Sequence, residues 1–258
     1  MARYIDINAD MGEGYGAYDI GNDAAMLDII STANLACGFH GGDPSIMAAR
    51  CGEAKAKKVR IGAHPGFPDI QGFGRRHVDM SFSEVRDLIA YQMGALDGVA
   101  RLSGYEIAHV KTHGALGHYT GDTEHAAEAL IAAVKAYRSD LIVMAMAGTA
   151  LVEMAEAAGL RVAREIFADR AYEEDGRLMS RKKAGSMIHD ADAAAENVAA
   201  MVRENAVISS TGKRIPLKSI DSVCTHGDSD NAIAISSRVK ARLIEEGFEV
   251  APFAETMA

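Results

Sequence analysis

The sequence predicts an α/β fold in which seven parallel strands and the helices between them form a β/α barrel. Short apolar runs rich in small and β-branched residues alternate with helix-like segments from one end of the chain to the other, as expected when crossover helices connect parallel strands. Polar residues follow nearly every run, which favours a barrel because a barrel gathers the carboxyl ends of its strands into one ring. The competing architecture is a doubly wound open sheet, which would bind a ligand at a switch point between strands.

The predicted strands are the apolar runs at residues 4–8, 32–36, 60–63, 107–111, 141–146, 162–167 and 219–225. Helices with recognisable starts lie between them. Asp43 predicts the start of a helix at residues 45–57, because an Asp side chain accepts free backbone N–H groups there. Ser81 and Glu84 have the spacing of a capping box before a helix at residues 85–102.

Composition predicts one domain over residues 1–258 and argues against nucleic acid as a partner. The 258 residues are 48% hydrophobic, enough for one sizeable core, and no Ser/Pro-rich linker divides them. Acidic residues outnumber basic ones by 36 to 27, which gives a net charge of -9. A chain of this charge without a basic region lacks the footprint of a DNA- or RNA-binding protein.

The sequence also predicts a cytoplasmic protein without a membrane segment. The longest apolar stretch, residues 141–152, is shorter than the roughly 18 to 20 residues that span a bilayer. The N-terminal MARYIDINADMGEG carries acidic residues where a signal peptide would be basic and then apolar, so export is not expected. Three cysteines, Cys37, Cys51 and Cys224, do not form a disulfide framework and fit a reducing compartment.

Two segments fit neither a helix nor a strand, and we expect them to cover one end of the barrel. Residues 65–79 hold two of the five prolines, and residues 169–190 are polar and basic. Long irregular loops in a compact domain are usually functional or disordered. The basic stretch at residues 177–183 is in addition a candidate contact for a partner, or else a solvated loop.

Four of the apolar runs end on a histidine followed by glycine or proline. The four are ACGFHGG at His40, IGAHPG at His64, VKTHGA at His113 and VCTHGD at His226. Imidazole titrates near neutral pH and is the commonest metal ligand, and a neighbouring glycine lets a substrate approach the backbone. A single histidine of this kind is more often a hydrogen-bonded structural residue, but four equivalent ones predict a shared site.

Other charged and polar residues follow the same strands, namely Asn8, Asp10, Glu13, Lys111, Asp169, Arg170 and Asp228. Lys111 lies in a partly buried run, so it needs an anionic partner or a lowered pKa; a structural salt bridge is the alternative. Asp10 and Asp228 could instead cap the helices that follow. Arg75 and Arg76 could bind a carboxylate or a phosphate bidentately, or form a solvated basic pair.

Zinc is a further, less favoured interpretation of the same residues, with Asp10, His40 and His64 or His113 as ligands. Cys224 and His226 share a strand face because their spacing is even, but the sequence has no CxxC pair and no HExxH motif. Without a metal the cysteines are small core residues. Neither a Walker motif nor a GxGxxG after a strand is present, so no known nucleotide motif is apparent.

Together these motifs resemble the LamB/YcsF family over almost the whole chain. The matching blocks are IDINADMGEGYG, TANLACGFHGGDP, IGAHPGFPDIQGFGRR, HVKTHGALGHY, FADRAY and VCTHGD. The chain departs from the family pattern at Thr112, where proline is usual, but it keeps Lys111 and His113. The resemblance implies a distorted TIM-like barrel of seven strands, related to the glycoside hydrolase and polysaccharide deacetylase group.

The resemblance further implies ATP-dependent opening of 5-oxo-L-proline to L-glutamate, in complex with two further subunits, B and C. ATP would be a co-substrate with Mg²⁺. Homo-oligomerisation stays open. The alternatives are a metal-dependent amide hydrolase that needs no ATP, and a substrate-binding subunit without catalysis of its own.

Within this interpretation, residues take different roles. We expect Asp10, His64 or His113 to activate water, and Lys111 with Arg75 or Arg76 to neutralise phosphate. Protonation of the departing nitrogen falls to His226 or His40. The residues expected to bind substrate or phosphate are Asn8, Glu13, His40, Arg75, Arg76, Asp169, Arg170 and Asp228.

Overall fold

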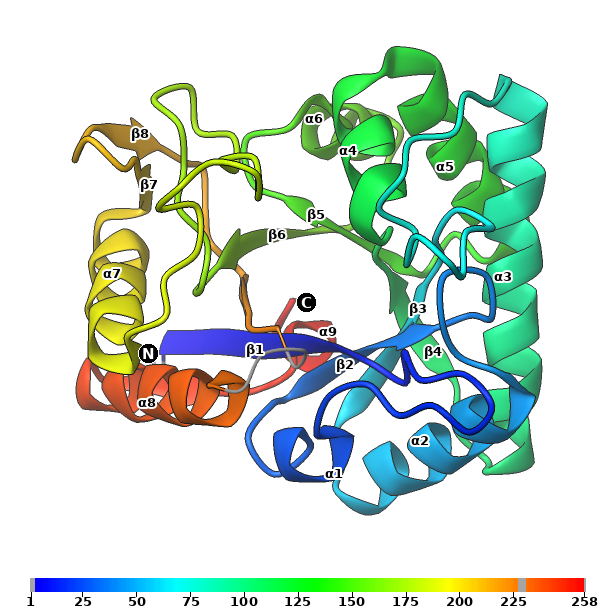
Figure 1. Cartoon of the computed structure of the whole chain (residues 1–258). Coiled ribbons are helices and arrows are strands. Elements are labelled where there is room, and N and C mark those ends of the chain that lie inside the picture. Colours follow the sequence, from blue (N-terminus) through cyan, green and yellow to red (C-terminus); the bar gives the residue numbers. More distant parts are fainter. Residues whose placement is uncertain (1–2, 227–230, 258) are drawn as a thin grey trace.

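A computed structural model of the chain, which describes residues 3–226 and 231–257, contains the predicted closed barrel (Figure 1). Its parallel strands are β1 (Arg3–Met11), β2 (Thr32–Ala36), β3 (Arg60–His64), β4 (Ile107–Val110), β5 (Ile142–Met146), β6 (Val162–Phe167) and β9 (Ser222–Cys224). The strands pair in that order, and β9 pairs with β1 to close the seven-stranded ring. The predicted fold class is therefore confirmed.

Strand β1 is longer than predicted, and this places Asp10 inside the barrel wall. It extends to Met11 rather than ending at Asn8, and it stays paired with β2 through the register Asp10↔Asn34 and Met11↔Leu35. Strand β9 is shorter than the predicted run at 219–225. Asp221, directly before it, is still bonded to β6: its side chain accepts from the backbone N–H of Arg164, and its own N–H donates to the Arg164 carbonyl.

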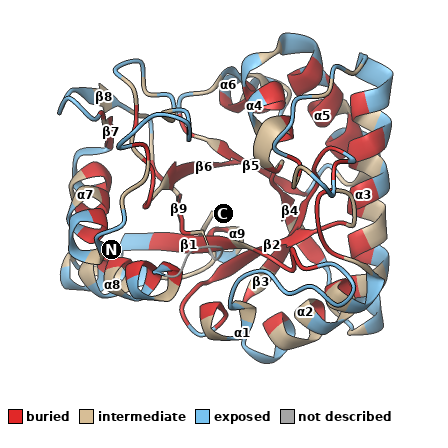
Figure 2. Ribbon diagram, viewed as in Figure 1, coloured by how far each residue is buried: buried red, intermediate tan, exposed pale blue. Residues whose placement is uncertain are grey.

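Helices surround the barrel and bury one face each (Figures 1 and 2). They are α1 (Asp23–Met26), α2 (Pro44–Ala56), α3 (Phe82–Leu102), α4 (Gly114–Asp122), α5 (Glu124–Tyr137), α6 (Ala150–Ala157), α7 (Ala191–Glu204) and α8 (Ala232–Glu245). The predicted caps form: Asp43 accepts from the N–H groups of Ser45 and Ile46, and Ser81 and Glu84 cap each other. Across the described ranges, none of the helices combines the length and the hydropathy needed to cross a bilayer.

The end of the chain closes the amino end of the barrel. Strand β10 (Phe248–Val250) pairs with the first residues of β1, and α9 (Phe253–Thr256) follows it. Phe253 is 1% exposed and packs against Ile142, Met144 and Ala163 from the barrel wall. Figure 1 shows α9, in red, within the outline of the ring. The sequence did not predict this segment, nor the small antiparallel pair β7 (Ala206–Ile208) and β8 (Arg214–Pro216).

The two segments that fit neither a helix nor a strand in the sequence line the opposite, carboxyl end of the barrel. We call residues 65–79 the first mouth loop and residues 169–190 the second mouth loop. The first is held to α4 by a hydrogen bond from the N–H of Ala115 to the carbonyl of Gly74. The second folds back on itself through bridges that pair Arg170 with Met187 and Tyr172 with Leu178.

Candidate functional site

A cavity of about 750 Å³ opens at the carboxyl end of the barrel strands. The five residues expected to act in catalysis all line it: Asp10, His64, Lys111, His113 and His226. They come from segments far apart in the sequence, and closure of the barrel brings them together because every parallel strand ends on the same side.

The residues expected to bind substrate or phosphate are divided by the structure. Glu13, Arg75 and Arg170 line the cavity, whereas Asn8, His40, Arg76 and Asp169 lie outside its lining. Arg76 is paired instead with Asp69, with 3.0 Å between Nε and Oδ1. Asp228 lies outside the described residues.

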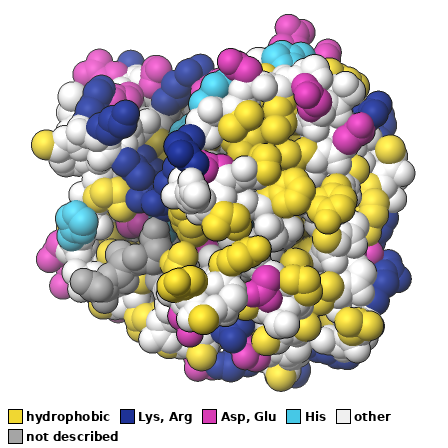
Figure 3. All heavy atoms as spheres, turned by 45° about the vertical axis from the view of Figure 1, so that its right-hand side comes forward, with side chains coloured by type: hydrophobic (Ala, Val, Ile, Leu, Met, Phe, Trp, Pro, Cys, Tyr) yellow, Lys and Arg dark blue, Asp and Glu magenta, His cyan; other side chains and the backbone are white. Residues whose placement is uncertain are grey.

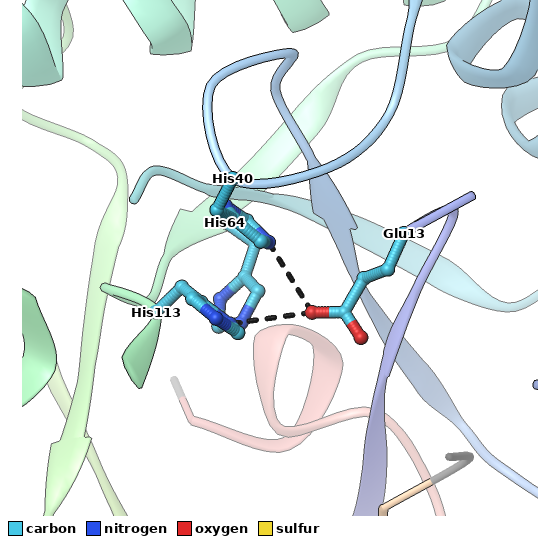
Figure 4. A group of neighbouring side chains, drawn as sticks. All are labelled: Glu13, His40, His64 and His113. Atoms are coloured by element: carbon cyan, nitrogen blue, oxygen red, sulfur yellow. Dashed lines mark hydrogen bonds and ion pairs between the residues drawn. The ribbon is translucent and has the colours of Figure 1, made fainter. Parts of the chain in front are cut away.

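Glu13, His40, His64 and His113 form a compact group that we call the histidine cluster (Figure 4). The Nε2 atom of His40 and the Nδ1 atom of His113 each lie 3.2 Å from the same Glu13 oxygen, Oε1. The rings of His40 and His113 stack with centroids 3.7 Å apart. Burial alone would raise the pKa of Glu13, but its hydrogen bonds to His113 and His40 outweigh burial and hold the pKa well below its usual value.

Backbone carbonyls fix the proton positions on two of these histidines. His64 donates from Nδ1 to the carbonyl of Lys111 at 2.7 Å, and His113 donates from Nε2 to the carbonyl of Phe73 at 2.8 Å. A carbonyl oxygen only accepts, so the other nitrogen carries a lone pair when the ring is neutral; when the ring is charged it carries a proton, which His113 can donate to Glu13. These two nitrogens, His64 Nε2 and His113 Nδ1, lie 3.1 Å apart. A proton or a metal cation between them would relieve the repulsion of the lone pairs.

In the histidine cluster, three of the six separations between candidate ligand atoms match a tetrahedral metal site, and all six are within 4.8 Å. Ligand atoms of a tetrahedral zinc site, with bonds of about 2.0–2.1 Å, lie roughly 3.3 Å from one another. The separations from Glu13 Oε1 to His40 Nε2 and His113 Nδ1, and from His113 Nδ1 to His64 Nε2, are 3.1–3.2 Å. The cluster contains Glu13 where the sequence suggested Asp10. Asp10 belongs to a second group of possible ligands with Cys224 and His226.

The metal interpretation also agrees with a neutral His40. Burial first, and then the nearby His113, lower the pKa of His40 to about 3. A ring that stays neutral at physiological pH keeps a lone pair available for coordination. Its Nδ1 atom is buried without a hydrogen-bond partner among the described residues.

Lys111 lies between two carboxylates beneath the cavity. Its Nζ atom is 2.9 Å from Asp10 Oδ1, 2.7 Å from Glu165 Oε1 and 3.2 Å from the Cys224 sulfur. Burial would lower the pKa of Lys111, but the charge of Asp10 first, and then that of Glu165, raise it well above its usual value. The geometry therefore resembles the salt-bridge alternative, with Lys111 holding Asp10 in place, and phosphate neutralisation by Lys111 stays a prediction.

The sequence analysis missed Glu165. The available signal was an acidic residue in the middle of the buried run Val162–Phe167, where a charge needs a partner. Asn8, expected to contact substrate, supports Asp10 from inside the barrel instead. Asn34 donates to Asn8 at 2.8 Å and to Asp10 at 2.9 Å through its amide nitrogen.

His226 is held separately by a carboxylate. Both oxygens of Asp169 lie 2.8 Å from its Nδ1 atom, and its ring stacks on Phe167. Burial would lower the pKa of His226, but the charge of Asp169 and the hydrogen bonds to it raise the pKa above its usual value. The remaining nitrogen, Nε2, is 3.4 Å from Arg181 Nη2. A histidine oriented in this way is suited to transfer a proton at Nε2.

Apolar side chains also line the cavity, namely Met144, Met146, Leu151, Leu178 and Met179. Strand β5, whose end offered no titratable side chain in the sequence, supplies two of them. The cavity therefore combines apolar side chains with a few polar groups, as is common in small-molecule sites.

The fold and the site place the protein in the class of β/α barrels that carry their polar groups at the carboxyl ends of the strands. Residues 5–258 match the LamB/YcsF family, and the chain belongs to that family. It is similar to the A subunit of 5-oxoprolinase from Rhodopseudomonas palustris (strain BisB5), with 50% identity over 97% of this chain and 98% of the relative. The corresponding 5-oxoprolinase chain of Clostridium beijerinckii is 46% identical over 96% of this chain and 97% of the relative.

Solved structures agree with this membership. The lactam utilization protein from Thermus thermophilus superposes with a TM-score of 0.90 and 41% identity, covering 96% of this chain and 99% of that one. A family 4 carbohydrate esterase from Streptomyces lividans superposes with a TM-score of 0.51 and 11% identity, covering 96% of this chain and 91% of that one. This second likeness concerns the fold alone.

Proposed function

We propose that the protein is one component of an ATP-dependent 5-oxoprolinase, which opens the lactam 5-oxo-L-proline to L-glutamate while ATP is hydrolysed to ADP and phosphate. Two relatives that carry the name of the A subunit of 5-oxoprolinase, at 46% and 50% identity over nearly their whole length, support this proposal. Because those relatives are named as subunits, we also propose that two partner chains, B and C, complete the enzyme in the cytoplasm.

The observation that carries the proposal is that one cavity holds two separate groups of histidines, each with a carboxylate beside it. Ring opening breaks the bond between the carbonyl carbon and the ring nitrogen; the carbon gains the hydroxyl of water and the nitrogen gains a proton. The lone pairs of His64 and His113 are suited to take a proton from water, beside Glu13 and Asp10. His226, whose pKa is raised by Asp169, is suited to supply the proton to the nitrogen.

In this scheme ATP is needed to activate the lactam. A five-membered lactam is an unstrained amide that water attacks slowly. Transfer of the γ-phosphoryl group from ATP to the lactam oxygen, which releases ADP, would activate the carbonyl carbon. Attack by water would then break the bond from this carbon to the ring nitrogen and leave an acyl phosphate, and a second water at the same carbon would release the former lactam oxygen with inorganic phosphate. The expected test places an oxygen label on the lactam carbonyl and follows turnover by the three mixed subunits with Mg²⁺ and ATP. The label should appear in inorganic phosphate; label found only in glutamate would contradict the phosphorylated intermediate.

The catalytic role of this chain is tested with His226→Gln and Asp10→Asn in the same mixture. We expect glutamate formation to fall by about 10²–10⁴-fold, with complex assembly unchanged on size-exclusion chromatography. His189→Gln, at an exposed position outside the cavity lining, is the matched control and should keep full activity. Full activity in both site variants would instead favour a substrate-binding role without catalysis.

A second candidate function is a metal-dependent amide hydrolase that needs no ATP, and the fit of the histidine cluster to a metal favours it. The cluster would hold the ion, which would supply Lewis-acid activation of water or of the carbonyl. Hydrolysis of 5-oxoproline by the chain alone, without ATP and lost on chelation, would select this function over the first.

A further inference from the structure

The cavity has a second end with different chemistry, which we call the arginine end. Arg170 and Arg181 come from the second mouth loop, and His118 comes from α4; all three line the cavity. The pKa of His118 is held below its usual value mainly by desolvation. The charges of Arg170 and Arg181 lower it further, although the nearby Asp122 raises it. Figure 3 shows Lys and Arg side chains gathered beside apolar ones on this side of the molecule.

Arg170 is a buried cation that has no carboxylate partner among the described residues. It is 5% exposed, and one guanidinium nitrogen, Nη2, donates to the carbonyl of Met179 at 2.6 Å. Its Nε atom has no hydrogen-bond partner within residues 3–226 and 231–257. Burial first, and then the charge of Arg181, lower the pKa of Arg170 to about 10. Buried charges are normally paired, so this arrangement favours an anion that arrives from outside.

The acidic residues nearby are already engaged. Asp169 directs both oxygens to His226. Asp122 is 3.3 Å from Arg177. No carboxylate of the described chain lies within 4.0 Å of Arg170 or Arg181. The protein as a whole has a net charge of -9. Two arginines that line a cavity with no described carboxylate within 4.0 Å therefore differ from the acidic character of the rest of the chain.

We propose that the arginine end is a phosphoryl-binding subsite formed by Arg170 and Arg181. The guanidinium group presents its donors in a planar fork that matches phosphate oxygens, and it stays charged at any physiological pH. Arg181 also lies beside His226 Nε2, so an anion bound there adjoins the proton-transfer group. A cavity of about 750 Å³ is within the range of roughly 300–1,000 Å³ that holds drug-sized ligands, which leaves room for a phosphorylated substrate.

The subsite deepens the proposed function, and its test does not depend on that function. The full-length chain is titrated with inorganic phosphate at low ionic strength by isothermal calorimetry. We expect Arg181→Gln to weaken phosphate binding about tenfold or more, since it removes a charge-assisted hydrogen bond to the anion. Lys183→Gln is the matched control, because Lys183 lies on the same loop, is paired with Glu173 at 2.6 Å and is absent from the lining; its affinity should equal that of the wild type.

Two further arms make the result specific. Acetate at equal concentration should not displace phosphate; equal displacement would overturn a phosphoryl subsite in favour of a general anion surface. ADP that competes with phosphate and is weakened by Arg181→Gln would identify a nucleotide as the source of the phosphoryl group. ADP that does not compete would identify a phosphorylated small substrate.

The outcomes separate this inference from the proposed function. Equal phosphate affinity in wild type and Arg181→Gln, or no binding by the wild type, overturns the subsite even when the three-subunit mixture forms glutamate normally. Conversely, weakened phosphate binding in Arg181→Gln supports the subsite even when no 5-oxoproline is consumed. That result would contradict 5-oxoproline as the substrate and leave the phosphoryl-binding subsite intact.

Discussion

At the scale of single residues, the most informative contacts are those that fix protons. The carbonyls of Lys111 and Phe73 each accept from one imidazole, and the opposite nitrogens of His64 and His113 then face each other at 3.1 Å. Nothing in the sequence around either histidine reveals this, because both carbonyls belong to other segments of the chain. The facing arrangement of these two nitrogens therefore depends on the fold, which brings the two carbonyls next to the rings.

The first prediction concerns metal binding at the histidine cluster. Under the second candidate function we expect the protein to bind Zn²⁺, and His113→Gln or Glu13→Gln to weaken binding at least tenfold, because each removes a ligand from a four-residue set. Binding is measured by equilibrium dialysis with elemental analysis, and by the visible spectrum of Co²⁺ in the same site. His189→Gln should bind as the wild type does. Equal zinc content in all variants would exclude the cluster as the site.

The second prediction concerns the pH dependence of activity. Because Asp169 raises the pKa of His226, Asp169→Asn should lower that pKa. If His226 acts as the proton donor, the high-pH limb of the kcat/KM profile then moves to lower pH. The profile is measured on the three-subunit mixture, with the exposed Asp87→Asn as the control. An unmoved limb would contradict proton donation by His226.

At the scale of helices and strands, the sequence predicted the elements whose positions are determined by burial. Parallel barrel strands are covered on both sides and therefore appear as apolar runs, and β2 and β6 begin and end where expected. Strand β10 has three residues of intermediate or high exposure, so no apolar run marks it. Its place beside β1 depends on contacts across nearly the whole chain.

The candidate site was predictable to the same extent. Barrel closure alone brings the strand-end histidines together, so the grouping of His64, His113 and His226 around one cavity could be expected. Which carboxylate joins which histidine could not, because it depends on where β1 ends. Since β1 continues through Met11, Asp10 stays in the wall beside Lys111, 3.3 Å from His64. Glu13, in the following loop, contacts His40 and His113 instead.

The third prediction concerns the segment that closes the amino end of the barrel. Phe253→Ala should lower the free energy of unfolding by about 3–5 kcal/mol, because it removes a fully buried aromatic ring. The measurement is urea unfolding followed by circular dichroism. Leu102→Ala, at a position 82% exposed, should change stability by less than about 0.5 kcal/mol. A loss below about 1 kcal/mol for Phe253→Ala would show that the segment is not packed as described.

At the scale of the whole molecule, a polar network runs through the barrel interior. Asp6, near the amino end, accepts hydrogen bonds from Ser31, Thr32 and Ser222, and Asn8 and Asn34 continue the network to Asp10. Burial raises the pKa of Asp6 to about 6, although these hydroxyl groups lower it in part. The folded protein therefore favours the protonated form of Asp6 more than the unfolded chain does.

The fourth prediction follows from the sign of this shift. The contribution of Asp6 to stability is fully present below its unfolded pKa of 3.8 and is lost as the pH rises through about 6. The stability of the wild type minus that of Asp6→Asn should thus fall by up to about 3 kcal/mol between about pH 4 and 6. Urea unfolding of both proteins across this range measures the difference. Parallel stability curves would contradict the raised pKa.

The closed amino end of the barrel has a kinetic consequence. With Phe253 seated among Ile142, Met144 and Ala163, the cavity communicates with solvent at the carboxyl end, between the two mouth loops. Reactant and product then share one opening, so the product must leave through it before the next reactant can enter. Under the proposed function, glutamate should act as a competitive inhibitor against 5-oxoproline, with exchange through the mouth setting an upper limit to turnover.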